Sequence, residues 1–312
     1  MTTGITADKP CLPPYAPEQA GKDLTTSLLR DVSRSFYLTL RVLPEQIRQQ
    51  ISVAYLLART TDTIADTEAV PKSERVALLN GLAAGRSPGR IGVTNATLGE
   101  VKLLDRLPEV LKRLESFLPE DRQRIWELLR TIVSGQIFDL ERFPGDPLTD
   151  DELDRYTYMV AGCVGEFWTK MCRAHLPDME GLNVEDSVHF GKGLQLVNIL
   201  RDMEEDRRRE RQYLPRLDDF PVWLDRATQH LDAGWRYTLA IPANQKRLRL
   251  ACVWPIWIGI KTIARLRQAG PGQPVKVSRS EVYWIMLESA LIVGNDAALD
   301  EVYQRLSRAA RL

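Results

Sequence analysis

The sequence lacks the residue patterns that define several common classes of protein. Its four cysteines, Cys11, Cys163, Cys172 and Cys252, are scattered and form no CxxC pair. This spacing argues against a disulfide scaffold or a zinc ribbon and favours a reducing compartment. The 42 basic residues are balanced by 42 acidic ones, whereas a domain that binds nucleic acid usually carries a basic surplus. We therefore expect no nucleic-acid partner and no cysteine-based framework.

Long apolar runs are also missing. The longest, residues 251–260, is interrupted by Pro255, and a helix needs about 20 apolar residues to span a bilayer. Residues 1–22 are polar and lack the charged start and apolar run of a signal peptide, so we expect a flexible N-terminal segment there. The sequence predicts a cytoplasmic protein with no transmembrane segment, and it leaves open a peripheral contact with a membrane surface.

Helical periodicity dominates what remains. Between residues 44 and 67, Ile47, Ile51, Tyr55 and Ala58 recur at intervals of three and four, as on one face of a helix. Period-two alternation, the mark of strands, is absent. Neither glycine-rich stretch, 81–99 or 270–274, separates segments of different composition. We therefore predict one all-α domain over residues 23–312. Helical spacing recurs at 103–118, 125–140, 156–171, 190–203, 223–240, 248–266 and 282–293.

The sharpest chemical feature is the set Tyr55, Arg59, Asp62 and Asp66. At about 100° per residue, these four positions fall within an arc of about 60° on one helix. Like charges one turn apart repel by about 0.2–0.5 kcal/mol even in water, and a bound cation relieves that repulsion. Carboxylate oxygens suit Mg²⁺, which often bridges them to substrate phosphates. Taken alone, the pattern also fits a solvated acidic face with Arg59 as an ion-pair partner.

A second acidic pair, Asp202 and Asp206, repeats this spacing in the segment 193–206. Gln195 lies on the same stripe with Asn198 beside it, and these amides are either satisfied core groups or part of a polar stripe that faces a ligand. Two helices that each carry such a pair can hold Mg²⁺ ions that bind diphosphate and neutralise it as a leaving group. The guanidinium group of arginine binds phosphate oxygens through two parallel hydrogen bonds. The candidates are Arg34, Arg59, Arg201 and Arg211.

Four segments, in chain order, resemble the squalene and phytoene synthase family, the head-to-head trans-prenyltransferases. They are DVSRSF at 31–36, YLLARTTDTIAD at 55–66, YTYMVAGCVGE at 156–166 and LQLVNILRDMEED at 194–206. The resemblance covers residues 25–289. It implies an isoprenoid synthase fold, all-α with a central active-site cavity, and two molecules of farnesyl diphosphate as substrates.

The resemblance also assigns roles to residues. It places Tyr156 near the reacting carbons as a catalytic group, where the phenol can handle a proton and the ring can stabilise a carbocation; the alternative is a packed helix tyrosine. It implies catalytic and Mg²⁺-binding roles for Asp62, Asp66, Asp202 and Asp206, with Asn198 as a further ligand. It implies diphosphate or cofactor contacts from Ser33, Arg34, Tyr55, Arg59, Gln195, Asn198, Arg201 and Arg211.

Within the family, the expected product depends on a reduction step. Squalene synthases reduce presqualene diphosphate with NADPH, whereas dehydrosqualene and phytoene synthases lose a proton and some relatives stop at the intermediate. Residues 274–280 resemble the basic flap near NADPH, with Lys276 in the matching place, although Ser278 replaces the next flap arginine. Ala65 stands where many squalene synthases carry an acid.

We expect a squalene synthase that uses Mg²⁺ and NADPH. No GxGxxG follows a strand, so the NADPH expectation depends on the resemblance alone. The alternatives are a dehydrosqualene or phytoene synthase, a presqualene diphosphate synthase, a cyclising terpene synthase, and an inactive relative that acts as an assembly factor.

Overall fold

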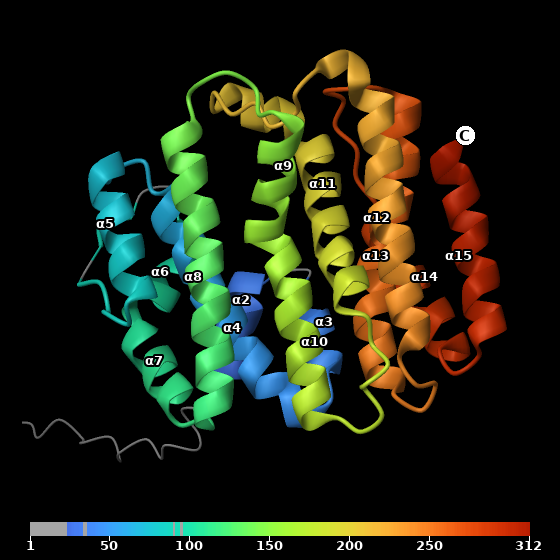
Figure 1. Cartoon of the computed structure of the whole chain (residues 1–312), viewed down its shortest axis with the longest axis horizontal. Helices are drawn as coiled ribbons and strands as arrows, with labels where there is room; N and C mark the ends of the chain where they lie inside the picture. Colours follow the sequence, from blue (N-terminus) through green and yellow to red (C-terminus); the bar gives the residue numbers. More distant parts are fainter. Residues whose placement is uncertain (1–23, 34–35, 90, 94–95) are drawn as a thin grey trace, which may run out of the picture.

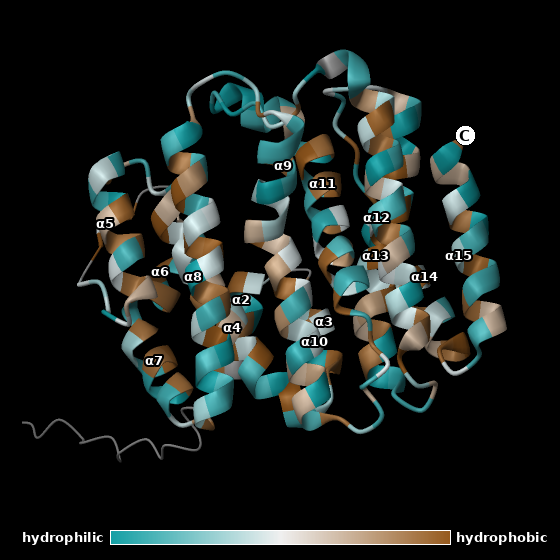
Figure 2. Cartoon of the chain, viewed as in Figure 1, coloured by the Kyte–Doolittle hydropathy of each residue, from teal (hydrophilic) through white to brown (hydrophobic). Residues whose placement is uncertain are grey.

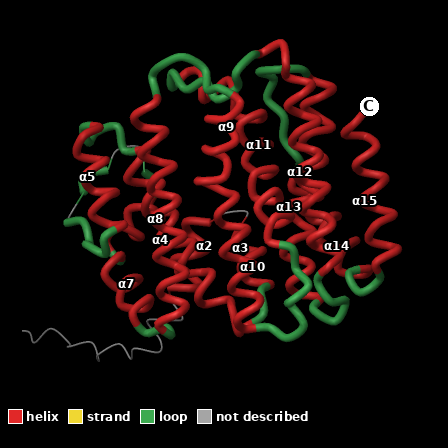
Figure 3. The backbone as a smooth tube through the Cα atoms, in the orientation of Figure 1, coloured by secondary structure: helices red, strands yellow, loops and turns green. Residues whose placement is uncertain are grey.

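The computed structural model describes residues 24–33, 36–89, 91–93 and 96–312, and every regular element among them is a helix (Figures 1 and 3). The all-α prediction is therefore confirmed. The predicted N-terminal segment 1–22 lies outside the described residues. The α-helices are α2 (Leu29–Ser33), α3 (Phe36–Val42), α4 (Glu45–Asp66), α5 (Lys72–Ala83), α6 (Leu98–Asp105), α7 (Leu107–Glu115), α8 (Pro119–Arg142), α9 (Asp150–Thr157), α10 (Cys163–His175), α11 (Val184–Arg208), α12 (Phe220–Ala240), α13 (Lys246–Ala269), α14 (Arg279–Ile292) and α15 (Asp296–Arg311). Three short helices, η1 (Leu24–Leu28), η2 (Tyr158–Gly162) and η3 (Leu217–Asp219), complete the set.

Local sequence signals set several helix ends. Ser278 and Glu281 form a capping box at the start of α14, and Thr149 caps α9 with Glu152 in the same way. One helix prediction was wrong: residues 103–118 divide into α6 and α7 at Arg106. Pro108 lies in the first turn of α7, and because proline lacks an amide hydrogen it favours a new helix start over continuation.

Helix α11 lies in the middle of the molecule, between α9 and α10 on one side and α12 on the other (Figure 1). Its contact with the preceding layer is close enough to need glycine. A Cβ on Gly165 of α10 would lie 1.9 Å from the carbonyl oxygen of Ser187, and one on Gly191 would lie 2.2 Å from that of Ala161. These glycines therefore let the backbones of η2 and α10 approach α11 directly.

Two groups of buried apolar side chains hold the helices together. One is centred on α4, α8 and α10, and the other on α11, α12, α13 and α15. Figure 2 shows hydrophobic and hydrophilic residues mixed along each helix, as expected where one face packs inward. Within the described residues, no helix is long and apolar enough to cross a membrane.

Candidate active site

The acidic stripe of α4 is tied to two neighbouring helices. Arg59 forms an ion pair with Asp62 at 3.6 Å and also contacts Glu100 of α6. Glu100 is 12% exposed and, with Thr97, caps its own helix. Glu100 belongs to the capping box of a different helix, so no sequence pattern connects it with Arg59. Tyr55 stacks on Phe36 of α3, with ring centroids 5.5 Å apart.

Asp62 accepts a hydrogen bond of 2.6 Å from the side-chain amide of Gln136 on α8. Withdrawal of water from this carboxylate, together with repulsion from Asp66, outweighs the attraction of Arg59 and raises the pKa of Asp62 to about 6. The side chain nevertheless remains 45% exposed. The Oε1 atom of Gln136 is buried and has no partner among the described residues. Asp62 is therefore hydrogen-bonded to Gln136 on α8, while the exposed part of its side chain is accessible to a ligand.

The acidic pair on α11 differs in the surroundings of its two members. Asp202 accepts a hydrogen bond of 2.7 Å from Nε of Arg201. Asp206 is half-buried, and desolvation raises its pKa to about 7, with repulsion from Asp202 and Asp139 opposing the attraction of Arg211. Asp206 consequently holds its negative charge less readily than a solvated aspartate does.

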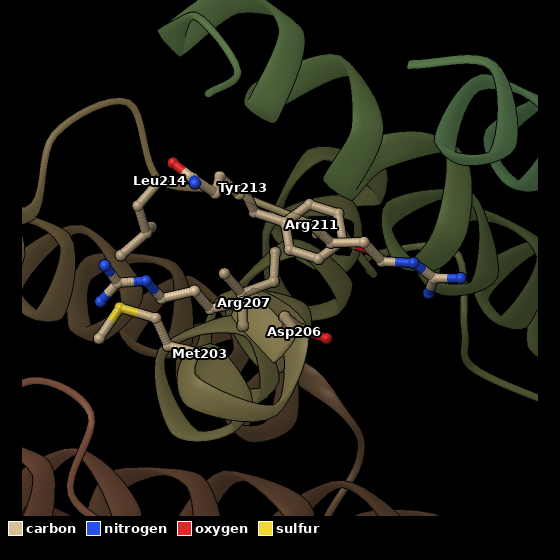
Figure 4. Close-up of a pocket in the computed structure, with 8 residues that line it drawn as sticks. Met203, Asp206, Arg207, Arg211, Tyr213 and Leu214 are labelled. Carbon is tan, nitrogen blue, oxygen red and sulfur yellow. The ribbon is translucent and has the colours of Figure 1, made fainter. Parts of the chain in front are cut away.

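Arg211 joins the two acidic helices. Its guanidinium lies 3.5 Å from Asp66 of α4 and 3.4 Å from Asp139 of α8. Its backbone amide donates a 2.9 Å hydrogen bond to the carbonyl of Asp206. Figure 4 shows the side chains of Asp206 and Arg211 extending to the same side, whereas Arg207 points the other way. The structure thus brings both predicted aspartate pairs to one region through a residue that the sequence also predicted.

A chain of buried hydroxyl groups leads away from Arg211. Tyr213 donates a 2.5 Å hydrogen bond to Asp139, and the Tyr156 hydroxyl donates to that of Tyr213 at 3.5 Å. The two tyrosine rings stack with centroids 5.1 Å apart. Burial raises the pKa of both phenols well above the usual value of 10.0, so both keep their protons near neutral pH. Asp139 and Tyr213 were missed from the sequence, although an aspartate within the apolar run Ile137–Leu140 was a usable signal.

An apolar hollow of about 360 Å³ adjoins this polar region. It is bounded by α3, α11, α13 and α14. Asn198 and Arg201 contribute to its wall, and Arg201 is the partner of Asp202. The polar site and the hollow therefore share one stretch of α11. The apolar lining comes from Phe36, Leu38, Leu194, Val197, Trp254, Pro255, Ile258, Val282 and Met286.

Other predicted residues have different surroundings. The Ser33 hydroxyl donates to the Leu29 carbonyl of its own helix at 2.5 Å. Gln195 is half-buried on α11. Lys276 is exposed and lines a second hollow beside Arg265, apart from the apolar one. Arg34 lies outside the described residues. Ligand contacts from these four side chains stay predictions.

The donor set is compatible with Mg²⁺ but does not form a complete site from protein atoms. No three or more His, Cys, Asp or Glu side chains among the described residues are grouped to hold a metal ion. Mg²⁺ commonly takes only one or two carboxylates and completes its shell with water and substrate phosphates. Asp62 and Asp206, whose pKa values are raised to about 6 and about 7, are carboxylates short of compensating positive charge. The residues therefore fit a magnesium ion that arrives with phosphate ligands.

The fold is that of known isoprenoid synthases. A ligand complex of TcSQS superposes with a TM-score of 0.75 over 94% of this chain and 98% of that one, at 19% identity. A ligand complex of a dehydrosqualene synthase gives 0.63 over 93% and 100%, at 18% identity. The sequence model of the squalene/phytoene synthase family matches residues 29–218. The chain belongs to this family, whose members are head-to-head prenyltransferases.

Three curated relatives carry different activities in their names. Squalene synthase LSS of Botryococcus braunii is 32% identical over 61% of this chain, a match that spans 41% of its own length. Phytoene synthase of Arthrospira platensis is 28% identical over 80% of this chain and 84% of its own. Presqualene diphosphate synthase of Rhodopseudomonas palustris is 32% identical over 58% of each. Identities of 28–32% leave the product to be proposed.

Proposed function

We propose that this chain is a squalene synthase. In the proposed reaction, two farnesyl diphosphates condense through presqualene diphosphate, and a hydride from NADPH then reduces that intermediate. The coupling step releases one diphosphate and one proton from carbon. In the reduction, a hydride from NADPH is transferred as the second diphosphate leaves, so this step gives squalene and NADP⁺ and needs no further proton. The observation that carries the proposal is the acidic site of α4 and α11, joined by Arg211 and bordered by an apolar hollow.

The charge of the site supports a diphosphate substrate that is bound together with cations. Six carboxylates and only three guanidinium groups meet there, so full ionisation leaves the site strongly negative. A diphosphate alone would be repelled by this excess. Mg²⁺, when bound, would neutralise the leaving diphosphate. The carboxylates are Asp62, Asp66, Glu100, Asp139, Asp202 and Asp206, and the arginines are Arg59, Arg201 and Arg211.

The chain's own residues have distinct proposed roles. Asp62, Asp66, Asp202 and Asp206 would hold Mg²⁺, with Asn198 as a further oxygen ligand. Arg59, Arg201 and Arg211 would turn from their carboxylate partners to phosphate oxygens, which guanidinium groups bind in bidentate fashion. The apolar hollow would take a prenyl chain and keep water from the cations that form during coupling.

Tyr156 is proposed to act beside the reacting carbons. Its hydroxyl is hydrogen-bonded to Tyr213, which is itself bonded to Asp139, so the ring is fixed in orientation. Tyr156 keeps its proton because burial raises its pKa. Its aromatic face would therefore stabilise a nearby carbocation, and its hydroxyl would pass a proton only to a stronger base.

The reduction step depends on the segment around Lys276. Lys276 precedes α14, whose residues Val282 and Met286 line the apolar hollow, so a cofactor held at this segment would lie near the hollow's wall. The competing proposal is an enzyme that stops at presqualene diphosphate or loses a proton to give dehydrosqualene or phytoene. The presqualene diphosphate synthase relative at 32% identity and the serine at position 278 favour that alternative.

Product analysis decides between these proposals. Purified protein is incubated with farnesyl diphosphate and Mg²⁺, with and without NADPH, and the products are separated by gas chromatography and mass spectrometry after phosphatase treatment. We expect squalene only with NADPH. Presqualene alcohol or dehydrosqualene in equal amount in both reactions would establish the competing proposal. Geranylgeranyl diphosphate serves as the chain-length control and is expected to react more slowly.

Variants test the assignment of the acidic pairs. Asp62→Asn and Asp202→Asn should each lower kcat by about 10²–10³, the cost of removing one preorganised charged group from such a site, without altering the far-UV circular dichroism spectrum. Asp151→Asn, an exposed position on α9, is the matched control and should keep full activity. Full activity in the two site variants would contradict the metal assignment. A folded wild-type protein that releases no diphosphate would indicate an inactive relative.

A further inference from the structure

Helix α14 is apolar on both its faces although it lies at the surface. Four large side chains on its outer face, Tyr283, Trp284, Leu287 and Leu291, are 66%, 65%, 51% and 79% exposed. They fall within about 100° on the helix, and we call them the α14 outer stripe. Eleven large apolar side chains of the described residues are exposed, and these four form the largest group on one helix. Grouped exposure of this kind marks an interaction surface.

The seating of α14 fixes the direction of this stripe. On the opposite face, Ile285 and Ser289 are buried, and the Trp254 indole of α13 donates a 3.0 Å hydrogen bond to the Ser289 hydroxyl. Val282 and Met286 line the apolar hollow. The inner face of α14 therefore packs against the rest of the protein, and the outer stripe faces away from the protein. One helix separates the hollow from whatever covers the stripe.

The charges around α14 favour a negatively charged partner. Glu281 is paired with Lys261 at 3.0 Å and with Arg265 at 2.7 Å, and Glu288 is paired with Arg305 at 2.8 Å. Both acidic groups of the helix are therefore already neutralised. Lys276 and Arg279, at the N-terminal end of the stripe, are exposed. In the part of the chain that the structure describes, neither is within ion-pair distance of a carboxylate.

Helix α15 does not offer a comparable surface, although its sequence is amphipathic. Its apolar residues Val302, Tyr303 and Ala310 are 7%, 2% and 0% exposed, and α15 packs mainly on α13 and α12 (Figure 1). Its apolar face is therefore used inside the fold. The outer stripe of α14 remains as the uncovered apolar surface at this end of the molecule.

We propose that the α14 outer stripe docks on the surface of a membrane that contains anionic lipids. Tryptophan and tyrosine rings favour the headgroup level of a bilayer, apolar side chains on one helix face enter the acyl boundary, and nearby basic residues are attracted to anionic headgroups. In this orientation the hollow lies one helix away from the bilayer, so apolar molecules need not cross bulk water to reach or leave it. The docking holds whichever product the enzyme makes.

Vesicle binding by the full-length wild-type protein tests the proposal without an activity measurement. Co-sedimentation is measured with vesicles of phosphatidylcholine alone and of phosphatidylcholine with about 30% phosphatidylglycerol. We expect binding to the anionic vesicles and a loss of at least about tenfold in the triple variant Y283S/W284S/L287S. Arg279→Gln should weaken binding about fivefold, which corresponds to about 1 kcal/mol for one basic residue at an anionic surface. The matched control L98S/L118S/V222S, which alters exposed apolar side chains elsewhere, should bind as the wild type does.

Three results would overturn the proposal. The wild type does not bind anionic vesicles; the control loses as much binding as the triple variant; or the wild type is a dimer that the triple variant converts to a monomer, with no vesicle binding by either. If the triple variant does not fold, quenching by brominated lipids decides. Wild-type fluorescence should be quenched and that quenching should be largely lost in Trp284→Phe, whereas equal quenching in both proteins would place the contact elsewhere.

Discussion

The raised pKa values of Asp62 and Asp206 predict how the stability of the metal-free protein changes with pH. The folded protein holds the protons of these carboxyls up to pKa values of about 6 and about 7, against an ordinary value of 3.8. Their contribution to stability is therefore fully present below pH 3.8 and is lost as the pH rises through the folded values. Without divalent cations, the free energy of unfolding should fall as the pH rises from about 4 to about 7.

The size of this effect is limited by solvent. One pKa unit corresponds to about 1.4 kcal/mol, but the Asp62 side chain is 45% exposed and Asp206 is only half-buried, so screening removes much of the nominal value. We expect about 1 kcal/mol from each group. Together they should lower the melting temperature by about 3 °C for a chain of 312 residues, because the entropy of unfolding is about 2.1 cal/mol/K per residue.

Thermal unfolding of the wild type and of the variant D62N/D206N measures the effect. His230 titrates with the opposite sign, because burial lowers its pKa to about 4, so its stability contribution is complete above pH 6.5 and is lost as the pH falls. That contribution is common to both proteins and cancels in their difference. The melting temperature of the wild type should fall relative to the variant as the pH rises, and Mg²⁺ with diphosphate should restore it only in the wild type. Parallel curves at every pH would refute the reasoning.

Three further outcomes are expected. Asp139→Asn should lower the free energy of unfolding by about 1–3 kcal/mol, and Asp66→Asn by at most about 1 kcal/mol. Both side chains lie about 3.5 Å from Arg211, but that of Asp139 is 9% exposed and that of Asp66 is 51% exposed. Equal losses in denaturant titrations would contradict this expectation. Tyr213→Phe should lower kcat more than it raises KM, since it frees the ring of Tyr156, and unchanged kcat would remove that positioning role. Ser278→Ala should lower the unfolding free energy by about 1 kcal/mol through loss of the α14 cap, measured in the same titrations against Ser280→Ala.

Periodicity predicted most of the fold because most helices pack one face inward. The α4 prediction of 44–67 differs from the structure, Glu45–Asp66, by one residue at each end. The break at Arg106 was missed because the apolar spacing continues through it and only Pro108 marks it. The stretch predicted as one helix over 156–171 contains the short π-helical segment Tyr158–Gly162. A π-helix has hydrogen bonds between residues five apart instead of four, and an apolar pattern that repeats every three or four residues does not reveal this difference.

The candidate site was predictable where function depends on spacing along one helix. Asp62 and Asp66, or Asp202 and Asp206, are recognisable because one helical turn separates them. Glu100 of α6, Gln136 and Asp139 of α8, and Tyr213 of the segment after α11 become neighbours of these groups only when those segments pack together. Nothing in a single sequence records that proximity, although a buried amide or carboxylate needs a partner and both Gln136 and Asp139 adjoin the apolar pair Ile137 and Phe138.

The pairing pattern of the arginines bears on the order in which ligands would enter the proposed site. Arg59, Arg201 and Arg211 are each paired with carboxylates of the site itself, so none offers phosphate an unpaired guanidinium. A diphosphate that arrived alone would have to displace a carboxylate and leave it uncompensated in a half-buried place, where an unpaired charge is costly. If cations reach the carboxylates first or together with the substrate, each displaced carboxylate gains a new partner and each arginine gains a phosphate oxygen. The same charge excess that opposes a bare anion therefore favours the cation-bound form.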